Sequence, residues 1–100
     1  LHDDAGVRAQ RERHRARIAR LRPAVEAAGL RVTGSTDGMY VWATTDDDGW
    51  DTAAKLADAG VLCMPGDVFG AAGANHVRFA VSISDERLEQ AVERLQQLAA

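Results

Sequence analysis

The chain has 100 residues, of which 46% are hydrophobic and 27% charged, and its formal net charge is −3. These values are typical of one globular domain and exclude a disordered chain. The single cysteine, Cys63, excludes an internal disulfide and a cysteine zinc cluster, and no apolar run approaches the roughly 20 residues of a membrane span. Because the chain begins with Leu1 and not with Met, we expect a piece of a longer protein. Its first thirty residues are charged and arginine-rich without an apolar segment, so no signal peptide is expected.

Residues 4–29 are predicted to form a helix. Proline removes a backbone donor and clashes with the preceding turn, so Pro23 predicts a kink or a restart near Leu21. Gly29 is a candidate C-cap glycine. The stripe expected to face the core recurs at spacings of seven, four and three residues, and it consists of Val7, His14, Ile18, Leu21, Val25 and Ala28.

Residues 30–35 and 39–44 are predicted to be the two strands of a hairpin. The first alternates apolar and polar side chains, and the second is rich in β-branched and aromatic residues. Thr36, Asp37 and Gly38 form the expected turn between them. Asp48 can cap a helix over 49–59 that Gly60 ends, with an apolar face made of Trp50, Ala53, Ala54 and Ala57.

The second half of the chain repeats this alternation. Residues 61–64 are predicted to be a short apolar strand, 65–75 a loop, and 77–83 a strand with one apolar face. Ser84 caps a final helix, whose stripe is Leu88, Ala91, Val92, Leu95 and Leu98. The order α-β-β-α-β-β-α predicts an α/β fold, an α+β two-layer sandwich in which helices cover a small, mostly antiparallel sheet.

Arg78 is the first candidate for a binding residue. It lies in the middle of a predicted strand, faces opposite to Val77 and Phe79, and has the small neighbours Ala80 and Ser82. The planar guanidinium matches a carboxylate through two parallel hydrogen bonds. A solvated or ion-paired arginine on a sheet face is the alternative.

The loop from Pro65 to Gly73 is the second candidate. Gly66, Gly70 and Gly73 would let its backbone approach a ligand closely. It lacks the glycine–lysine–serine ending of a phosphate loop and the glycine spacing of a dinucleotide site. An ordinary connection between strands is the alternative.

Other side chains give no catalytic or metal site. The run Asp46–Asp48 before Gly49 lacks the acid and the glutamate of a calcium loop, so a turn and a helix cap are expected instead. The histidines (His2, His14 and His76) are scattered without a second ligand at metal spacing, and Lys55 has no apolar surroundings that would activate an amine. Cys63 lies in an apolar strand and is expected to be an inert core thiol.

The arginines concentrate at the start of the chain. Residues 1–31 hold eight arginines and four acids, a local charge of +4. Such a block can bind nucleic acid or a membrane surface, but its arginines spread around the helix and no aromatic residues lie between them. We therefore expect a solvated face with local ion pairs rather than nucleic-acid binding.

Several short motifs together resemble a known family. In order, they are Gly38–Trp42, Leu56–Ala57 with Gly60–Leu62, Pro65–Gly70, Gly73, His76–Ala80 and Asp85–Leu88. Nearly the whole chain thereby resembles the C-terminal small domain of the fold-type I (class I/II) pyridoxal-phosphate aminotransferases. Within that family it is most similar to the actinobacterial N-succinyldiaminopimelate aminotransferases of lysine biosynthesis, through Tyr40–Thr44, Trp50–Asp51, His76–Arg78 and Asp85–Arg87.

The resemblance implies a role for Arg78, because the family's arginine at this strand position binds the α-carboxylate of the amino-acid substrate. Residues 1–100 would then be one domain of a cytoplasmic, homodimeric enzyme whose large domain holds pyridoxal phosphate and the catalytic lysine. Lys55 does not match that lysine, so this domain alone is expected to be inactive. The expected partners are amino-acid and 2-oxo-acid substrates and the large domain, without nucleic acid, membrane or metal. A free-standing module that binds an amino or keto acid through Arg78 is the alternative.

Overall fold

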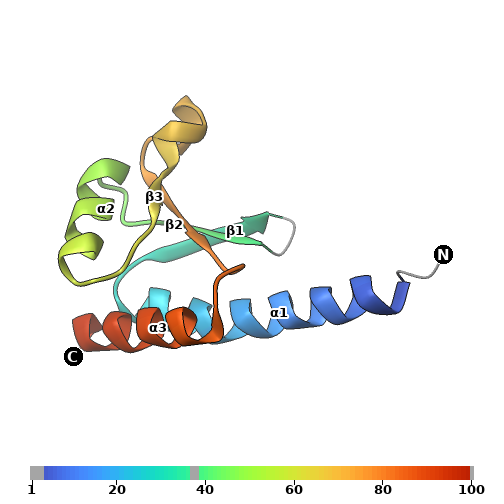
Figure 1. Ribbon diagram of the computed structural model, residues 1–100. Helices are drawn as coiled ribbons and strands as arrows, with labels where there is room; N and C mark the ends of the chain where they lie inside the picture. Colours follow the sequence, from blue (N-terminus) through green and yellow to red (C-terminus); the bar gives the residue numbers. More distant parts are fainter. Residues whose placement is uncertain (1–3, 37–38, 100) are drawn as a thin grey trace.

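The computed structural model describes residues 4–36 and 39–99, so two residues of the predicted hairpin turn, Asp37 and Gly38, lie outside the described part. The predicted order of helices and strands is confirmed (Figure 1). The helices are α1 (Asp4–Ala27), α2 (Gly49–Asp58) and α3 (Asp85–Ala99), with two short 3₁₀ turns, η1 (Gly66–Phe69) and η2 (Ala71–Gly73). The strands are β1 (Arg31–Thr36), β2 (Tyr40–Thr44), β3 (Met64–Pro65) and β4 (His76–Ala80).

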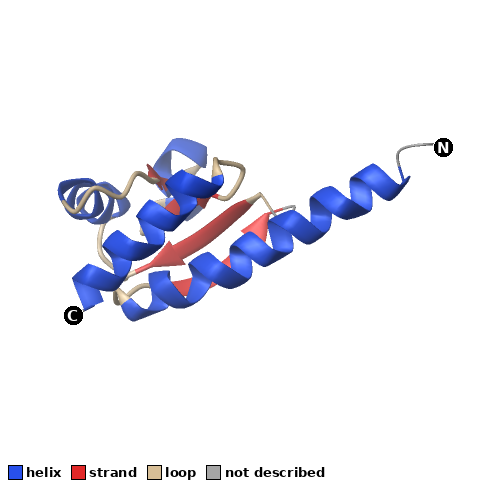
Figure 2. Ribbon diagram, turned by 60° about the horizontal axis from the view of Figure 1, so that its bottom comes forward, coloured by secondary structure: helices blue, strands red, loops and turns tan. Residues whose placement is uncertain are grey.

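The four strands form one sheet in the order β1-β2-β4-β3, and every neighbouring pair is antiparallel. Helices α1 and α3 lie side by side across one face of this sheet, as Figure 2 shows. The turns η1 and η2 rise on the other side (Figure 1). The predicted two-layer α/β architecture is therefore confirmed. Neither α1 nor α3 covers the opposite face of the sheet, the open face, where η1 and α2 contact β4.

The core lies between the sheet and the two long helices. Alternate strand residues point into it, so Val41 and Ala43 of β2 are buried beside Val77 and Phe79 of β4. The helices contribute five buried residues of the predicted stripes, Leu21, Val25, Leu88, Val92 and Leu95. Ala24, outside the predicted stripe of α1, is also buried in the core. Leu98, predicted for the same stripe, is 46% exposed because it lies in the last turn of α3.

Helix α1 runs without a break through Pro23, so the predicted restart near Leu21 is wrong. Packing of Leu21 and Val25 against the core fixes the turns on both sides of the proline, and tertiary packing outweighs the lost donor. The predicted C-cap at Gly29 is confirmed: its φ is +101°, and the N–H of Leu30 donates to Val25 O at 3.3 Å. The N-terminal half of α1 extends beyond the sheet (Figure 2), and Val7 is 40% exposed.

Helix α2 begins after Asp48 as predicted, since a carboxylate oxygen of Asp48 accepts a hydrogen bond from Trp50 N at 2.7 Å. Its predicted apolar face is confirmed only at Ala53, which is half-buried and packs against the core. Thr52 and Leu56 are buried instead, whereas Trp50 is 55% exposed. The cause is a backbone contact at its first residue, Gly49. The N–H of Gly49 donates to Ala74 O at 2.8 Å, and a Cβ on this glycine would lie 2.3 Å from the carbonyl oxygen of His76. This contact fixes the rotation of α2 against β4.

Two strands are shorter than predicted. The strand expected over 61–64 reduces to Met64–Pro65, and the strand expected over 77–83 ends at Ala80. The carbonyl oxygens of Val81 and Ile83 instead accept hydrogen bonds from the Arg17 side chain of α1, at 3.0 and 2.6 Å. Ser84 caps α3 as predicted, with Arg87 N donating to its hydroxyl oxygen at 3.2 Å. None of the helices in the described ranges is long and apolar enough to cross a membrane.

Candidate functional site

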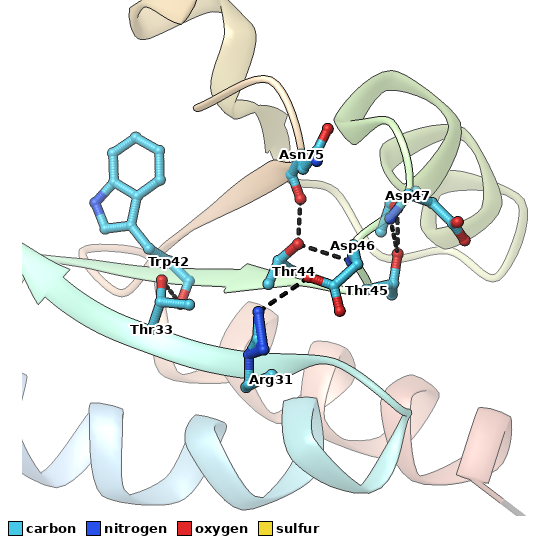
Figure 3. Close-up of polar contacts among 9 residues, drawn as sticks. Arg31, Thr33, Trp42, Thr44, Thr45, Asp46, Asp47 and Asn75 are labelled. Atoms are coloured by element: carbon cyan, nitrogen blue, oxygen red, sulfur yellow. Dashed lines mark hydrogen bonds and ion pairs between the residues drawn. The ribbon is translucent and has the colours of Figure 1, made fainter. Parts of the chain in front are cut away.

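The open face of the sheet, opposite α1 and α3, carries the predicted binding residue. In the register of β2 and β4, Trp42 lies opposite Arg78 and Tyr40 lies opposite Ala80. Residues directly opposite one another in an antiparallel pair share a face, and these four alternate with the buried core positions. Figure 3 shows the Trp42 side chain on the side of the sheet away from α1. Arg78 is therefore half-buried on the open face, as the alternation of its strand predicts.

Aromatic rings surround the Arg78 guanidinium. Its Cζ lies 3.8 Å from the ring centroid of Tyr40 and 3.8 Å from that of Phe69. Trp42 meets Phe69 edge to face, with the ring centroids 5.8 Å apart and an interplanar angle of 84°. Among the side chains that the structure describes, no carboxylate forms an ion pair with Arg78. Among the described residues, Arg78 is therefore not the ion-paired sheet arginine of the alternative interpretation.

The glycine-rich segment brings Phe69 to this site. A Cβ on Gly66 would lie 2.4 Å from the carbonyl oxygen of Gly73, so the two 3₁₀ turns touch through their backbones. Gly70 between them has a φ of +136°, a value that side chains other than glycine rarely allow. The indole Nε1–H of Trp50 donates to a carboxylate oxygen of Asp67 at 3.2 Å and ties η1 to α2. The loop backbone therefore packs against itself and carries the Phe69 ring to Arg78, while its approach to a ligand stays a prediction.

Two hollows adjoin these residues. The larger, about 550 Å³, is lined by Arg78 and Ala80, by the segment before β3 that includes Cys63, and by Arg87 and Arg94 of α3. The smaller, about 280 Å³, is lined by Trp42, Phe69, His76 and the three loop glycines Gly66, Gly70 and Gly73. Within the described part of the chain, the buried Nδ1 of His76 has no hydrogen-bond partner. Arg78 therefore adjoins the larger hollow, beside α3, whereas Trp42 and Phe69 line the smaller one.

The other candidates from the sequence lie elsewhere or have structural roles. His14 is half-buried on α1, and His2 lies outside the described residues. Cys63 is half-buried, and burial raises the pKa of its thiol to about 11, so it stays protonated at neutral pH. No group of three histidine, cysteine, aspartate or glutamate side chains that could hold a metal ion occurs in the described ranges.

The acidic run after β2 forms a turn, as predicted (Figure 3). Asp46 accepts a hydrogen bond from Arg31 at 3.0 Å, and its backbone N–H donates to the hydroxyl of Thr44 at 2.9 Å. The Thr44 hydroxyl in turn donates to the carbonyl oxygen of Asn75, before β4. These contacts join the end of β2 to the start of β4, and the run has a structural role.

The arginines of α1 divide into two groups. Arg15 pairs with Glu12 at 2.9 Å, a local ion pair of the predicted kind. Arg20 instead reaches both carboxylate oxygens of Glu89 on α3, at 2.7 to 3.2 Å. This contact raises the pKa of Arg20 and lowers the pKa of Glu89. Together with Arg17, it attaches α1 to α3, so part of the basic block stabilises the fold, which the sequence analysis did not anticipate.

Lys55 lines neither of the two hollows. The only lysine of the chain, Lys55, is exposed on α2, whereas the aromatic side chains of the site gather around Arg78 on the sheet. A lysine that holds pyridoxal phosphate must meet its carbonyl carbon inside a site closed to water.

Tyr40 and Phe69 are contacts of Arg78 that were not predicted from the sequence. A signal for Tyr40 was present, since an aromatic residue two positions before Trp42 in a strand shares its face. Phe69 comes from a turn that local periodicity does not describe, and only the flanking glycines indicated a constrained segment there.

Comparisons with known proteins agree with this architecture. A family model described as aminotransferase class I and II matches residues 1–95. A probable aminotransferase of Mycobacterium tuberculosis is 50% identical over 95% of this chain, which covers 23% of that relative. The 4-dedimethylamino-4-oxo-anhydrotetracycline transaminase of Streptomyces rimosus is 45% identical over 95% of this chain and 26% of its own length. The chain thus spans about a quarter of the relatives it matches.

Solved structures give the same result. The N-succinyldiaminopimelate aminotransferase from Mycobacterium tuberculosis superposes with a TM-score of 0.82 at 30% identity, over 97% of this chain and 27% of that one. An aminotransferase from Staphylococcus aureus has a TM-score of 0.83 at 29% identity, over 98% of this chain and 27% of its own. Since the family model covers nearly every residue and the fold agrees with these enzymes, the chain belongs to the class I and II aminotransferase family.

Proposed function

We propose that residues 1–100 form the C-terminal small domain of a pyridoxal-phosphate-dependent aminotransferase, in which Arg78 binds the α-carboxylate of the substrate. The observation that supports this role is a half-buried guanidinium on the open sheet face, packed against two rings and without an ion-pair partner among the described carboxylates. A partly buried cation without an anion has a desolvation cost, so a site of this kind fits an anion that arrives from solution. The forked donors of arginine match a carboxylate through two hydrogen bonds.

In our proposal, the residues that bind the cofactor and perform the catalysis belong to the rest of the protein, outside these 100 residues. The large domain would hold the cofactor and the catalytic lysine, because Lys55 is exposed on α2 and does not fit that role. The complete protein would be a cytoplasmic homodimer that acts on amino acids and 2-oxo acids. The chain's own residues would bind and orient the substrate carboxylate and exclude water around it.

The proposed substrate is N-succinyldiaminopimelate, in lysine biosynthesis. A structural relative with that activity in its name supports this proposal at 30% identity. Other relatives are named LL-diaminopimelate aminotransferase, after a related amino acid. One of them, from Oleidesulfovibrio alaskensis, is 32% identical to this chain. The Streptomyces rimosus relative, named for a tetracycline intermediate, is 45% identical. A panel of amino donors that contains N-succinyldiaminopimelate and the standard amino acids tests the choice directly.

The test of the arginine role uses Arg78→Ala in the complete protein, with Arg31→Ala as the matched control. Arg31 is exposed on β1 and pairs with Asp46, away from the aromatic rings. Loss of a desolvated charge pair costs about 2–5 kcal/mol, so kcat/KM for the best amino donor should fall by about 30-fold or more, with a raised KM. The control should leave kcat/KM within about twofold. Unchanged kinetics in Arg78→Ala would refute the assignment.

The absorption spectrum of the complete protein separates the enzyme from the free-standing module. A transaminase is expected to be yellow, and its band should shift when an amino donor is added. A colourless protein that binds amino or keto acids through Arg78 without turnover would instead support the binding module.

A further inference from the structure

The two rings beside Arg78 limit the directions from which a ligand can approach its guanidinium. Both centroids lie 3.8 Å from the same carbon, Cζ, with Tyr40 on β2 and Phe69 on η1. A planar guanidinium stacks on aromatic faces, and a Cζ 3.8 Å from a ring centroid is at the distance of such stacking. The N–H bonds of a guanidinium lie in its plane, so stacking leaves their donors directed outward. Ligands that meet Arg78 along this plane can accept two hydrogen bonds.

Each ring is held in place independently of the other. Tyr40 is fixed by the register of β2 with β4, in which it lies opposite Ala80, two residues beyond Arg78. Phe69 is fixed by the backbone contact between the two 3₁₀ turns and by the edge-to-face contact with Trp42. Two separate elements of the fold thus converge on one side chain, although an arginine on a strand needs neither ring to fold.

We propose that Tyr40 and Phe69 are positioning residues, which hold the Arg78 guanidinium so that its N–H edge meets an incoming carboxylate. This inference rests on the proposed function of Arg78 and adds the residues that act through it. The rings reduce the rotamers of a long, flexible side chain before the ligand arrives. Binding then has less side-chain freedom left to remove, which is the general basis of preorganisation.

The inference predicts which part of each ring matters. The contact is made by the ring face of Tyr40, so Tyr40→Phe should keep the KM for the best amino donor, whereas Tyr40→Leu should raise it. The ordering cost of one long side chain corresponds to a rise of about 2- to 13-fold. Phe69→Leu should raise KM over the same range and Phe69→Tyr should not. In the two leucine variants, kcat should change less than KM. Phe69 lies on a surface turn and is 46% exposed, so its replacement leaves the core intact.

The experiment measures KM and kcat for these variants of the complete protein, with the best donor among the standard amino acids as the probe. The same substitutions are then made in an Arg78→Lys background, because an ammonium has no planar fork to orient. If the rings act through Arg78, Tyr40→Leu and Phe69→Leu lose most of their effect there. Equal effects in both backgrounds, or a KM that follows the Tyr40 hydroxyl, would overturn the inference. An unchanged KM in Arg78→Lys and Arg78→Ala alike would instead refute the proposed function, so the two failures are distinguishable.

Discussion

Removing the charged head of Arg17 should destabilise the fold more than removing any other arginine of α1. The side chain is only 20% exposed, and its Nη1 donates to the carbonyl oxygens of Val81 and Ile83 at 3.0 and 2.6 Å. Its Nη2 lies 2.5 Å from a carboxylate oxygen of Asp85. In Arg17→Met the apolar stem remains and these three contacts are lost, so the variant isolates the polar part of the interaction.

The magnitude follows from the burial of each partner. Hydrogen bonds from a charged group to the chain contribute about 1.5–3 kcal/mol each when they are partly buried. Asp85 is 90% exposed, so its ion pair adds at most about 1 kcal/mol. Some water can replace the lost donors at the loop, which lowers the sum. We expect the free energy of unfolding to fall by about 2–4 kcal/mol, a large part of the roughly 5–15 kcal/mol of a typical domain.

Urea denaturation followed by circular dichroism measures this loss. With a slope of about 2 kcal/mol per molar, in the usual range for a small protein, the midpoint should move down by about 1–2 M. The exposed Arg13 on the same helix provides the control, and Arg13→Met should stay within about 0.5 kcal/mol of the parent chain. If Arg17→Met behaves like Arg13→Met, the contacts to Val81 and Ile83 do not stabilise the fold and the reasoning is wrong.

Three further predictions concern other parts of the fold. Gly66→Ala places a Cβ 2.4 Å from the carbonyl oxygen of Gly73, so the 3₁₀ turns must separate at a cost of about 1–3 kcal/mol, and an unchanged melting temperature would contradict the contact. Arg20 lowers the pKa of Glu89, so their ion pair stabilises the fold above pH 4.5, the ordinary carboxyl pKa, and loses this effect as the pH falls through the lowered pKa. The difference in urea midpoint between the parent chain and Arg20→Gln should therefore shrink in acid. A difference that stays constant with pH would count against the pair. With a pKa of about 11, the Cys63 thiol of the folded chain should react with iodoacetamide far more slowly at pH 8 than in the unfolded chain, whereas equal rates would show that the thiol is not shielded.

The sequence predicted the parts of the fold that local chemistry determines. Asp48 and Ser84 cap their helices because a short polar side chain accepts hydrogen bonds from the backbone N–H groups within reach. Gly29 ends α1 because it adopts a positive φ. Arg78 was found by the alternation of its strand, since a period of two separates the core face from the open face.

The features that were missed depend on contacts between distant segments. The rotation of α2 is set by the backbone of Gly49 against β4, and no periodicity within the helix contains that information. Likewise, the hydrogen bonds of Arg17 join residues 64 and 66 positions apart, and they end β4 earlier than its apolar alternation suggests. The ring of Phe69 reaches Arg78 only because the two 3₁₀ turns fold back over the sheet.

The arrangement of the sheet and helices also sets the order in which the chain can fold. Strand β4 is the last strand in the sequence but occupies a central place, between β2 and β3. Helix α1, the first element, packs against α3, the last one, through contacts such as the one from Arg17 to Asp85, 68 positions later. During synthesis, the contacts of α1 with α3 and of β2 with β4 therefore cannot form until residues 76–99 have emerged. Folding that depends on such distant pairings is slower than that of a helical bundle of the same length.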